Sequence, residues 1–280
     1  MSAMIMDGKA LAKKKKEEIH EKASQLRRQP GLAVILVGDN PASQVYVRNK
    51  EKDCEECGIV CYDYRLPQDS TQEQVLELVE KMNNYGAVDG ILVQLPLPPQ
   101  IDERVVLEAI APDKDVDAFH PENVGRIMQG QAYCKPCTPA GVMEMLHEYG
   151  IDPAGKHCVV VGRSNIVGKP MGMLLLHENA TVTICHSRSV NLPEVCRKAD
   201  ILIAAAGQPG LIGREHVRAG QVVLDVGTHM DENGVVRGDA RFDEVEPIVS
   251  AITPVPGGIG AVTTPILAAH TVKAAKHSIR

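Results

Sequence analysis

The sequence predicts an α/β protein of two domains, each built on a parallel β-sheet. Short runs rich in Val, Ile and Leu alternate along the chain with longer amphipathic stretches. This alternation is typical of strands that are buried on both faces and covered by helices. The length of 280 residues is enough for two ordinary domains. The proline-rich run 135–139 (KPCTP) marks a connection near the middle of the chain.

Three strands are expected before this connection and four after it, with helices between them. The expected strands are residues 32–37, 59–64, 89–94, 157–161, 181–185, 201–205 and 221–226. The expected helices are residues 8–29, 44–57, 71–83, 140–149, 168–178 and 264–276.

The last of these helices is rich in alanine and follows a Gly/Pro loop. Such a helix can return to pack on the first domain, so the predicted domains are not contiguous in the sequence. The first domain comprises residues 1–139 with the C-terminal helix 263–280, and the second comprises residues 140–262.

The composition argues against two classes of protein. A net charge of -6 at pH 7 does not suit a protein that binds nucleic acid by neutralising phosphates. The longest apolar runs, 32–37 and 201–206, are far shorter than the roughly 18 residues needed to span a bilayer. Residues 1–6 are too short for the apolar core of a secretion signal. We therefore expect a cytoplasmic protein with no nucleic-acid and no membrane partner.

The eight cysteines are expected to be reduced thiols, because thiols stay reduced in the cytoplasm. Two pairs have the spacing of zinc ligands, Cys54 with Cys57 and Cys134 with Cys137. Cys54, Cys57 and Cys61 also repeat at the spacing of a buried helix face, where cysteine packs as a small hydrophobe. Buried structural thiols are the favoured interpretation, and a zinc site at Cys134 and Cys137 is the alternative.

The second half of the chain contains a glycine-bearing turn between a strand and a helix. Residues 157–161 are followed by residues 162–170 (GRSNIVGKP) and then by a helical stretch. This is the layout of the phosphate-binding turn in dinucleotide-binding folds. Ser164 stands where the second glycine of the usual G-x-G-x-x-G would be. A plain strand–helix turn is the alternative interpretation.

The residues after the next strand indicate which dinucleotide binds. A site that prefers NAD carries a carboxylate there, which accepts hydrogen bonds from the ribose 2′-hydroxyl. Here strand 181–185 is followed by His, Ser187, Arg188 and Ser. Serine and arginine can donate to a 2′-phosphate, and Arg163 can add a second cation. The predicted cofactor is therefore NADP, with a solvated surface arginine as the alternative for Arg188.

The first half places a phenol and an amine on one helix face. Ser43, Tyr46 and Lys50 are spaced three and four residues apart, so they share one side of the expected helix 44–57. Such a pair can present both groups to one small volume. An exposed amphipathic helix is the alternative interpretation.

Two further segments suggest a ligand site. Gln94 ends a buried strand and precedes a proline-rich run, and ligands collect at the carboxyl ends of parallel strands. Asp113, Asp115 and Asp117 then gather three carboxylates within five residues. A solvated loop with capping roles is the alternative for these aspartates.

Six segments in this order resemble the bifunctional methylenetetrahydrofolate dehydrogenase/cyclohydrolase (FolD) family over nearly the whole chain. They are residues 38–46 (GDNPASQVY) with Lys50, 90–98 (GILVQLPLP), 114–117 (KDVD), 136–139 (PCTP), 161–164 (VGRS) with 167–170 (VGKP), and 253–260 (TPVPGGIG). Each segment alone is a weak signal, but their combination and order are specific.

The resemblance implies two α/β domains, the second a Rossmann-type NADP-binding domain, with the active site in the cleft between them. It implies a homodimer formed mainly through the NADP-binding domains. It also implies that 5,10-methylenetetrahydrofolate gives a hydride to NADP and that the methenyl product is hydrolysed to 10-formyltetrahydrofolate. The expected partners are tetrahydrofolate derivatives and a second copy of the chain.

The resemblance also implies roles by position. Lys50 is similar to the family's catalytic lysine, Gln94 to the residue that orients it, Tyr46 to the residue that packs against the folate, and Asp117 to the residue that anchors the pterin. The other implied substrate contacts are Val93, Leu95, Pro256, Gly257 and Gly258. The implied cofactor contacts are Thr138, Gly162, Arg163, Ser164, Ser187, Arg188 and Thr228.

The chain departs from the usual family pattern at three places. Ala118 stands where glycine is usual, and it should be strained if that backbone needs a positive φ. Thr228 and His229 replace the common Ile-Asn, and residues 261–262 (AV) replace the common Pro-Met. Two alternatives stay open: a dehydrogenase-only member of the family, and a non-catalytic NADP-binding protein of the same fold.

Overall fold

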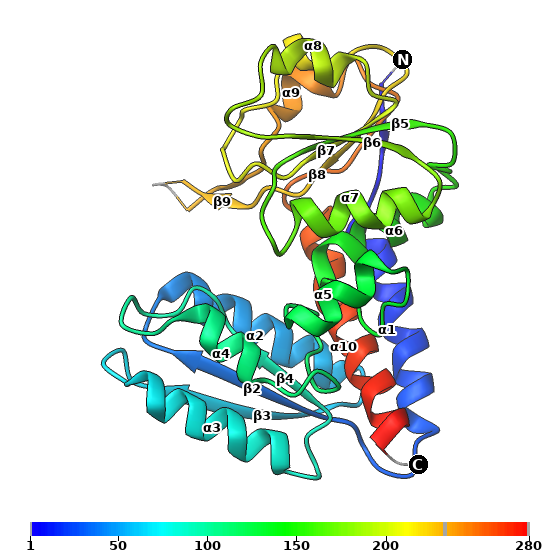
Figure 1. Ribbon diagram of the computed structural model, residues 1–280. Helices are drawn as coiled ribbons and strands as arrows, with labels where there is room; N and C mark the ends of the chain where they lie inside the picture. Colours follow the sequence, from blue (N-terminus) through cyan, green and yellow to red (C-terminus); the bar gives the residue numbers. More distant parts are fainter. Residues whose placement is uncertain (1, 232–233, 279–280) are drawn as a thin grey trace. The chain divides into compact units, whose positions relative to one another are not determined.

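The chain folds into two compact units in the computed structural model (Figure 1), which describes residues 2–231 and 234–278 without the side chains of residues 41, 42, 45 and 46. The six-stranded unit comprises Met1–Lys13 and Pro136–Thr263. The three-stranded unit comprises Lys14–Lys135 and Thr264–Arg280. Helices α1 (Gly8–Ser24) and α10 (Ile259–Ser278) each begin in the six-stranded unit and continue into the other.

The three-stranded unit is a parallel sheet with the strand order β3-β2-β4. Its strands are β2 (Gly31–Val37), β3 (Val60–Leu66) and β4 (Gly90–Val93). Its own helices are α2 (Pro41–Glu56), α3 (Gln72–Asn84), α4 (Glu103–Ala109) and α5 (Pro121–Met128). Helix α2 packs on β2 and β3, whereas α3 packs on β4 and on α4.

Local sequence explains where these helices begin and what they bury. The Thr71 hydroxyl oxygen accepts a hydrogen bond from the Gln74 N–H, and the Thr71 N–H donates one to Gln74 Oε1. This capping box starts α3. The buried residues of α3 are Val75, Val79 and Met82, which form a stripe at helical spacing. Together with alternate residues of β2 and β4 they form one hydrophobic core on that side of the sheet.

The six-stranded unit is a parallel sheet with the strand order β1-β11-β8-β7-β5-β6. Its strands are β1 (Met4–Ile5), β5 (His157–Val161), β6 (Thr181–Cys185), β7 (Ile201–Ala204), β8 (Val222–Asp225) and β11 (Ala251–Ile252). A separate antiparallel hairpin joins β9 (His229–Met230) to β10 (Val236–Arg237).

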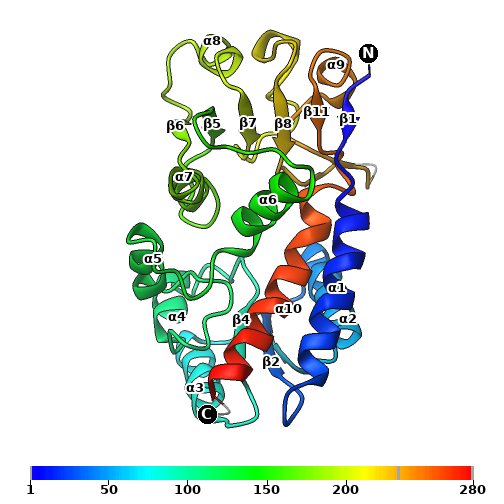
Figure 2. The same cartoon turned by 90° about the vertical axis from the view of Figure 1, so that its right-hand side faces the viewer.

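Helices cover both faces of this sheet, as Figures 1 and 2 show. On one side lie α6 (Cys137–Glu148) and α7 (Gly168–His177), and on the other lie α8 (Leu192–Arg197) and α9 (Phe242–Val245). The 3-10 helix η1 (Arg214–His216) packs against α8. Because both faces are covered, β7 and the last four residues of β5 are continuous apolar runs.

The predicted fold class is confirmed, and each of the seven expected strands matches an observed one to within two residues at either end. The short strands β1, β11, β9 and β10 and the helices α4, α5, α8 and α9 were not expected. Helix α1 ends at Ser24, before the expected residue 29, and α10 begins at Ile259, before the expected residue 264.

The division of the chain differs from the expected one at the N-terminus. Met4 and Ile5 pair in parallel with Ala251 and Ile252, so the first residues join the six-stranded unit instead of the unit that contains residues 14–135. The C-terminal residues from Thr264 onward group with the three-stranded unit.

The expected helix face with three cysteines is wrong at Cys61. Helix α2 ends at Glu56, and Gly58 then takes a φ of 79°, which reverses the chain. Cys61 therefore lies in β3 and is only partly buried, whereas Cys54 and Cys57 are fully buried.

Candidate active site

A lysine and a glutamine meet at the carboxyl edge of the three-stranded sheet. Lys50 belongs to α2, and Gln94 is the residue that follows β4. The Lys50 Nζ group donates a hydrogen bond to Gln94 Oε1 at 3.2 Å. Both residues are partly exposed, so the amine is held in place and a ligand can still reach it.

Backbone contacts fix the amide of Gln94. Its Nε2 group donates to the Leu95 carbonyl at 2.6 Å, and its backbone N–H donates to the Ile35 carbonyl of the neighbouring strand at 2.9 Å. Because the amide nitrogen is occupied in this way, the amide oxygen is the atom that faces Lys50. Val93, which is buried, and Leu95, which is partly exposed, flank Gln94 in the chain.

The third residue of the expected helix face is only partly described. Tyr46 belongs to α2, but its side chain lies outside the part of the chain that the structure describes. Ser43 is buried, and its backbone N–H donates to Asn40 Oδ1 at 3.1 Å, which fixes the first turn of α2.

The three clustered aspartates have different environments. Asp115 is buried and accepts hydrogen bonds from the His120 N–H at 2.8 Å and from Asn123 Nδ2 at 2.9 Å. Burial raises the pKa of Asp115. This residue has the capping role that was the alternative interpretation of the cluster. Asp113 is exposed, and Asp117 is partly exposed, so a ligand can reach the Asp117 carboxylate.

Ala118 follows Asp117 and stands where glycine is usual in the family. Its backbone has a positive φ, the conformation that would explain the usual glycine. Its φ is 58°, and its methyl group is fully buried. A residue with a Cβ atom is strained in this region by roughly 1–2 kcal/mol. The loop that carries Asp117 therefore stores strain at the adjacent residue.

A histidine of α10 supports the same loop. The Nδ1–H group of His270 donates to the Val116 carbonyl at 2.9 Å, one residue before Asp117. Burial lowers the pKa of His270 to about 4, so the ring is neutral at pH 7. Sequence reasoning missed His270, because a single histidine in an alanine-rich helix carries no signal of its long-range contact.

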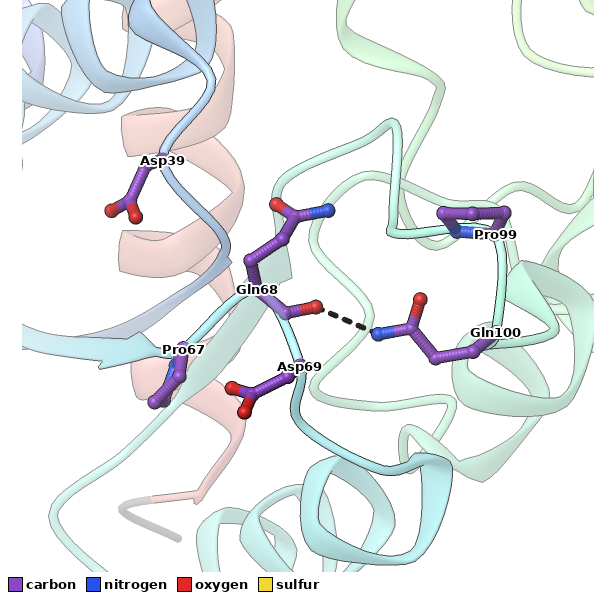
Figure 3. Close-up of a pocket in the computed structure, with 6 residues that line it drawn as sticks. All are labelled: Asp39, Pro67, Gln68, Asp69, Pro99 and Gln100. Carbon is purple, nitrogen blue, oxygen red and sulfur yellow. Dashed lines mark hydrogen bonds between the residues drawn. The ribbon is translucent and has the colours of Figure 1, made fainter.

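An open pocket of about 650 Å³ lies at the same carboxyl edge of the sheet (Figure 3). Its lining residues follow β2, β3 and β4, and they are Asp39, Pro67, Gln68, Asp69, Pro99 and Gln100. Gln100 Nε2 donates to the Gln68 carbonyl at 2.7 Å, the bond drawn in Figure 3. The two lining carboxylates give this pocket a negative potential.

In the six-stranded unit, the expected dinucleotide turn is tightly packed. Gly162 has a φ of 142°, and a Cβ atom there would lie 2.0 Å from the Ala205 carbonyl oxygen. A Cβ atom on Gly168 would lie 2.3 Å from the Gly162 carbonyl oxygen. Ser164 Oγ accepts hydrogen bonds from the Val167 and Gly168 N–H groups at 3.1 and 3.3 Å. Ser164, which stands in place of a second glycine, thus holds the backbone N–H groups just where α7 begins.

The loop after β6 presents the two residues expected to meet a 2′-phosphate. The His186 N–H donates to Ser189 Oγ at 2.9 Å, and the Arg188 N–H donates to His186 Nδ1 at 3.1 Å. These bonds close a tight turn. Ser187 and Arg188 are exposed on it, beside the turn that follows the neighbouring strand β5. Arg163 is exposed as well.

The remaining expected contacts also belong to the six-stranded unit. Thr138 is partly exposed in the first turn of α6, and Thr228 is exposed after β8. Pro256, Gly257 and Gly258 follow β11, and Gly257 has a φ of 104°. The structure therefore brings Lys50 together with Gln94, and it carries the expected cofactor contacts on separate loops of the other unit.

No group of three or more His, Cys, Asp or Glu side chains within residues 2–231 and 234–278 could hold a metal ion. Burial raises the pKa of Cys134 to about 12. All eight cysteines are free thiols. Within the same ranges, no helix is both long enough and apolar enough to cross a membrane.

Comparison with known proteins identifies both halves of the chain. The catalytic domain of the tetrahydrofolate dehydrogenase/cyclohydrolase family matches residues 6–117, and its NAD(P)-binding domain matches residues 136–279. The chain is 54% identical over 279 residues to the bifunctional protein FolD of Acetivibrio thermocellus, covering 99% of this chain and 98% of that protein. It is 53% identical over 279 residues to the bifunctional protein FolD of Streptococcus pneumoniae, covering 98% of each.

Solved structures agree with these matches. The bifunctional FolD enzyme of Campylobacter jejuni has a TM-score of 0.96 at 48% identity, covering 99% of both chains. The Trypanosoma brucei FolD enzyme, solved in complex with NADP cofactor and an inhibitor, has a TM-score of 0.96 at 39% identity, covering 100% of this chain and 99% of that one. The chain therefore belongs to the tetrahydrofolate dehydrogenase/cyclohydrolase family of bifunctional enzymes.

Proposed function

We propose that this enzyme oxidises 5,10-methylenetetrahydrofolate with NADP and hydrolyses the resulting 5,10-methenyltetrahydrofolate to 10-formyltetrahydrofolate. The observation that carries the proposal is the hydrogen bond from Lys50 Nζ to Gln94 Oε1 at the carboxyl edge of the three-stranded sheet. A dehydrogenase-only enzyme would have no need of a positioned amine. A non-catalytic protein would need neither residue.

The residues around the dinucleotide turn fit NADP. A Cβ atom on Gly162 or Gly168 would collide with a backbone carbonyl oxygen, so these two glycines let the turn pack closely between β5 and α7, as the glycines of a dinucleotide-binding turn do. Arg163, Ser187 and Arg188 are exposed and would hold the 2′-phosphate. Thr138, Ser164 and Thr228 are the other proposed contacts. The bound dinucleotide supplies the hydride acceptor.

Lys50 would handle the proton of the hydrolytic step. The methenyl carbon is already cationic, so it needs no electrophilic activation by the protein. Water that attacks this carbon must lose a proton, and Lys50 can accept it when its amine is in the neutral form. Gln94 keeps Nζ in place through its amide oxygen. Hydride transfer needs correct positioning of the folate and has no such proton step.

Asp117 would anchor the pterin. The amino and amide edge of a reduced pterin is rich in hydrogen-bond donors, and a partly exposed carboxylate can accept from it. Tyr46 would pack against the folate ring. The other proposed folate contacts are Val93, Leu95, Pro256, Gly257 and Gly258.

The proposal includes a cytoplasmic homodimer formed through the six-stranded units. Eight free thiols suit a reducing compartment. Met230 and Val235 of the β9–β10 hairpin are exposed apolar residues, which supports a subunit contact at this hairpin. Light scattering on the purified protein should give twice the mass of one 30.3 kDa chain.

The deciding experiment follows the methenyl chromophore. With methylenetetrahydrofolate and NADP, the enzyme should form methenyltetrahydrofolate and then consume it. Methenyltetrahydrofolate supplied without NADP should be hydrolysed on its own. A protein that forms the chromophore but never consumes it would be dehydrogenase-only, and one that does neither would contradict the proposed function.

A further inference from the structure

A buried carboxylate ties together two loops at the carboxyl edge of the six-stranded sheet. Asp239 is fully buried. It accepts hydrogen bonds from three consecutive backbone N–H groups in the loop after β7, those of Ala206, Gly207 and Gln208, at 2.6, 3.0 and 3.0 Å. This single side chain therefore holds the course of that loop.

The fourth donor to Asp239 is a side chain. His229 begins β9, just beyond the loop after β8, and its Nε2 lies 2.8 Å from Asp239 Oδ1. Gly227 makes this approach possible, because a Cβ atom there would lie 2.4 Å from the same oxygen. His229 is 23% exposed at its side chain, whereas the Asp239 side chain is not exposed at all.

The loop that Asp239 holds packs directly on the dinucleotide turn. The Ala205 N–H donates at 2.9 Å to the carbonyl of Val161, which is the last residue of β5. A Cβ atom on Gly162 would lie only 2.0 Å from the Ala205 carbonyl oxygen, so the loop and the turn are in close contact there. His229 is therefore connected to Gly162 by successive contacts, first to Asp239, then to residues 205–208, and then to the turn.

We propose that His229 is a positioning residue for the dehydrogenase reaction. By donating from Nε2 to Asp239 Oδ1, it keeps the carboxylate oriented toward the Ala206–Gln208 amides, and these in turn hold the Ala205 carbonyl against the cofactor turn. The other three donors are backbone groups, so His229 is the donor that a substitution can remove. The inference rests on the proposed function, because it assumes that the turn at Gly162 binds NADP.

The test compares His229→Ala with His229→Gln. Alanine removes the donor, whereas the glutamine side chain carries an N–H that reaches about as far as Nε2. His229→Ala should weaken NADP binding by roughly 5–10-fold, about the worth of one ordinary intramolecular hydrogen bond, because His229 acts on the cofactor turn only through Asp239, and it should raise the KM for NADP to the same extent. His229→Gln should restore both values to within twofold. Hydrolysis of supplied methenyltetrahydrofolate should stay unchanged in both variants.

The matched control is His157→Ala. His157 is also a hydrogen-bonded histidine of the six-stranded unit, with contacts to the Lys198 carbonyl and to Thr183 Oγ1. It is the first residue of β5, so it lies at the amino ends of the strands, whereas the dinucleotide turn follows their carboxyl ends. This variant should bind NADP like the unmodified enzyme. His229→Leu, which keeps apolar bulk without a donor, should behave like His229→Ala and covers the case in which alanine fails to fold.

Direct titration with NADP separates the possible outcomes. Unchanged NADP affinity in His229→Ala and His229→Leu, or a loss that His229→Gln does not restore, would overturn the positioning role. An unmodified enzyme that binds NADP but does not oxidise methylenetetrahydrofolate would overturn the proposed function. In that case the binding titrations alone would still decide the role of His229.

Discussion

At the scale of single residues, the structure separates groups that support the site from groups placed to act in it. Asp115 and Asp117 are two residues apart, yet Asp115 is buried under backbone and amide donors while Asp117 is partly exposed. The sequence could not distinguish them, because the hydrogen bond between Asn123 and Asp115 depends on the folded loop. Lys50 and Gln94 are 44 residues apart in the chain. Only the family resemblance predicted that they belong together.

Lys50→Met separates the two activities at one residue. Methionine keeps much of the apolar bulk and removes the amine that would accept a proton during hydrolysis. Cyclohydrolase activity should fall by about 10²–10⁴-fold, the usual worth of a general acid or base. Dehydrogenase activity should fall much less, so methenyltetrahydrofolate should accumulate. Normal hydrolysis of supplied methenyltetrahydrofolate by Lys50→Met would show that Lys50 has no catalytic role.

Ala118→Gly tests the strain beside Asp117. Glycine relieves roughly 1–2 kcal/mol of strain at a positive φ, but it loses a buried methyl group worth about 0.8 kcal/mol and adds roughly 0.4–1 kcal/mol of unfolded-state entropy. These terms nearly cancel. The free energy of unfolding, measured in urea, should therefore change by less than about 1 kcal/mol.

Ala268→Gly provides the control for this strain. Ala268 is equally buried, but it lies in the middle of α10, where glycine costs about 1 kcal/mol of helix propensity on top of the lost methyl group. This variant should lose about 2 kcal/mol of stability. An equal loss in Ala118→Gly would mean that Ala118 carries no strain.

At the scale of elements, long buried strands were predictable and short ones were not. Strand β2 is an apolar run of seven residues and β5 contains one of four, Cys158–Val161, and such runs are visible in the sequence alone. Strands β1 and β11 have two residues each, and Met4 and Ile5 are largely exposed. These strands exist because Met4 and Ile5 pair with Ala251 and Ile252, a contact over nearly the whole chain length.

The burial of His270 of α10 makes stability depend on pH. The folded state lowers the pKa of His270 from 6.5 to about 4. Below pH 6.5 the unfolded chain therefore binds a proton that the folded chain does not, and stability falls as the pH falls. Between pH 7 and pH 5 this residue alone should lower the free energy of unfolding by about 2 kcal/mol.

His270→Asn isolates this effect. Asparagine can still donate from its amide nitrogen to the Val116 carbonyl, but it does not titrate. The free energy of unfolding in urea should be measured at pH 7 and at pH 5 for both proteins. Its fall between the two pH values should be about 2 kcal/mol smaller in His270→Asn than in the unmodified protein. Equal losses in the two proteins would mean that His270 is not held neutral by the fold.

At the scale of the whole molecule, the expected site residues are divided between the two units. Lys50, Gln94 and Asp117 belong to the three-stranded unit, and the expected cofactor contacts Arg163 and Arg188 belong to the six-stranded unit. The alternation of strands and helices predicted two sheets, and the proline-rich run predicted where the chain passes between them. The position of the first residues was not predictable, because it depends on the pairing of β1 with β11.

This division predicts that cofactor selectivity and hydrolysis can be changed independently. Arg188 is exposed on the loop after β6, where a carboxylate would favour NAD. A hydrogen bond to a charged group is worth about 1.5–3 kcal/mol, so Arg188→Ala should raise the KM for NADP by roughly 10–100-fold. The KM for NAD should barely change, because NAD has no 2′-phosphate. Cyclohydrolase activity should be unaffected, because Lys50 and Gln94, the residues proposed to act in hydrolysis, belong to the other unit.

The control for Arg188 is Arg214→Ala, which removes an exposed arginine from η1, an element that includes neither the dinucleotide turn nor the loop after β6. It should leave both Michaelis constants unchanged, and this result would exclude a general effect of lower positive charge. Two results would contradict NADP selectivity through Arg188. One is equal efficiency of the unmodified enzyme with NADP and NAD. The other is an equal rise of both Michaelis constants in Arg188→Ala, since a lost contact to the 2′-phosphate can affect only the cofactor that carries it.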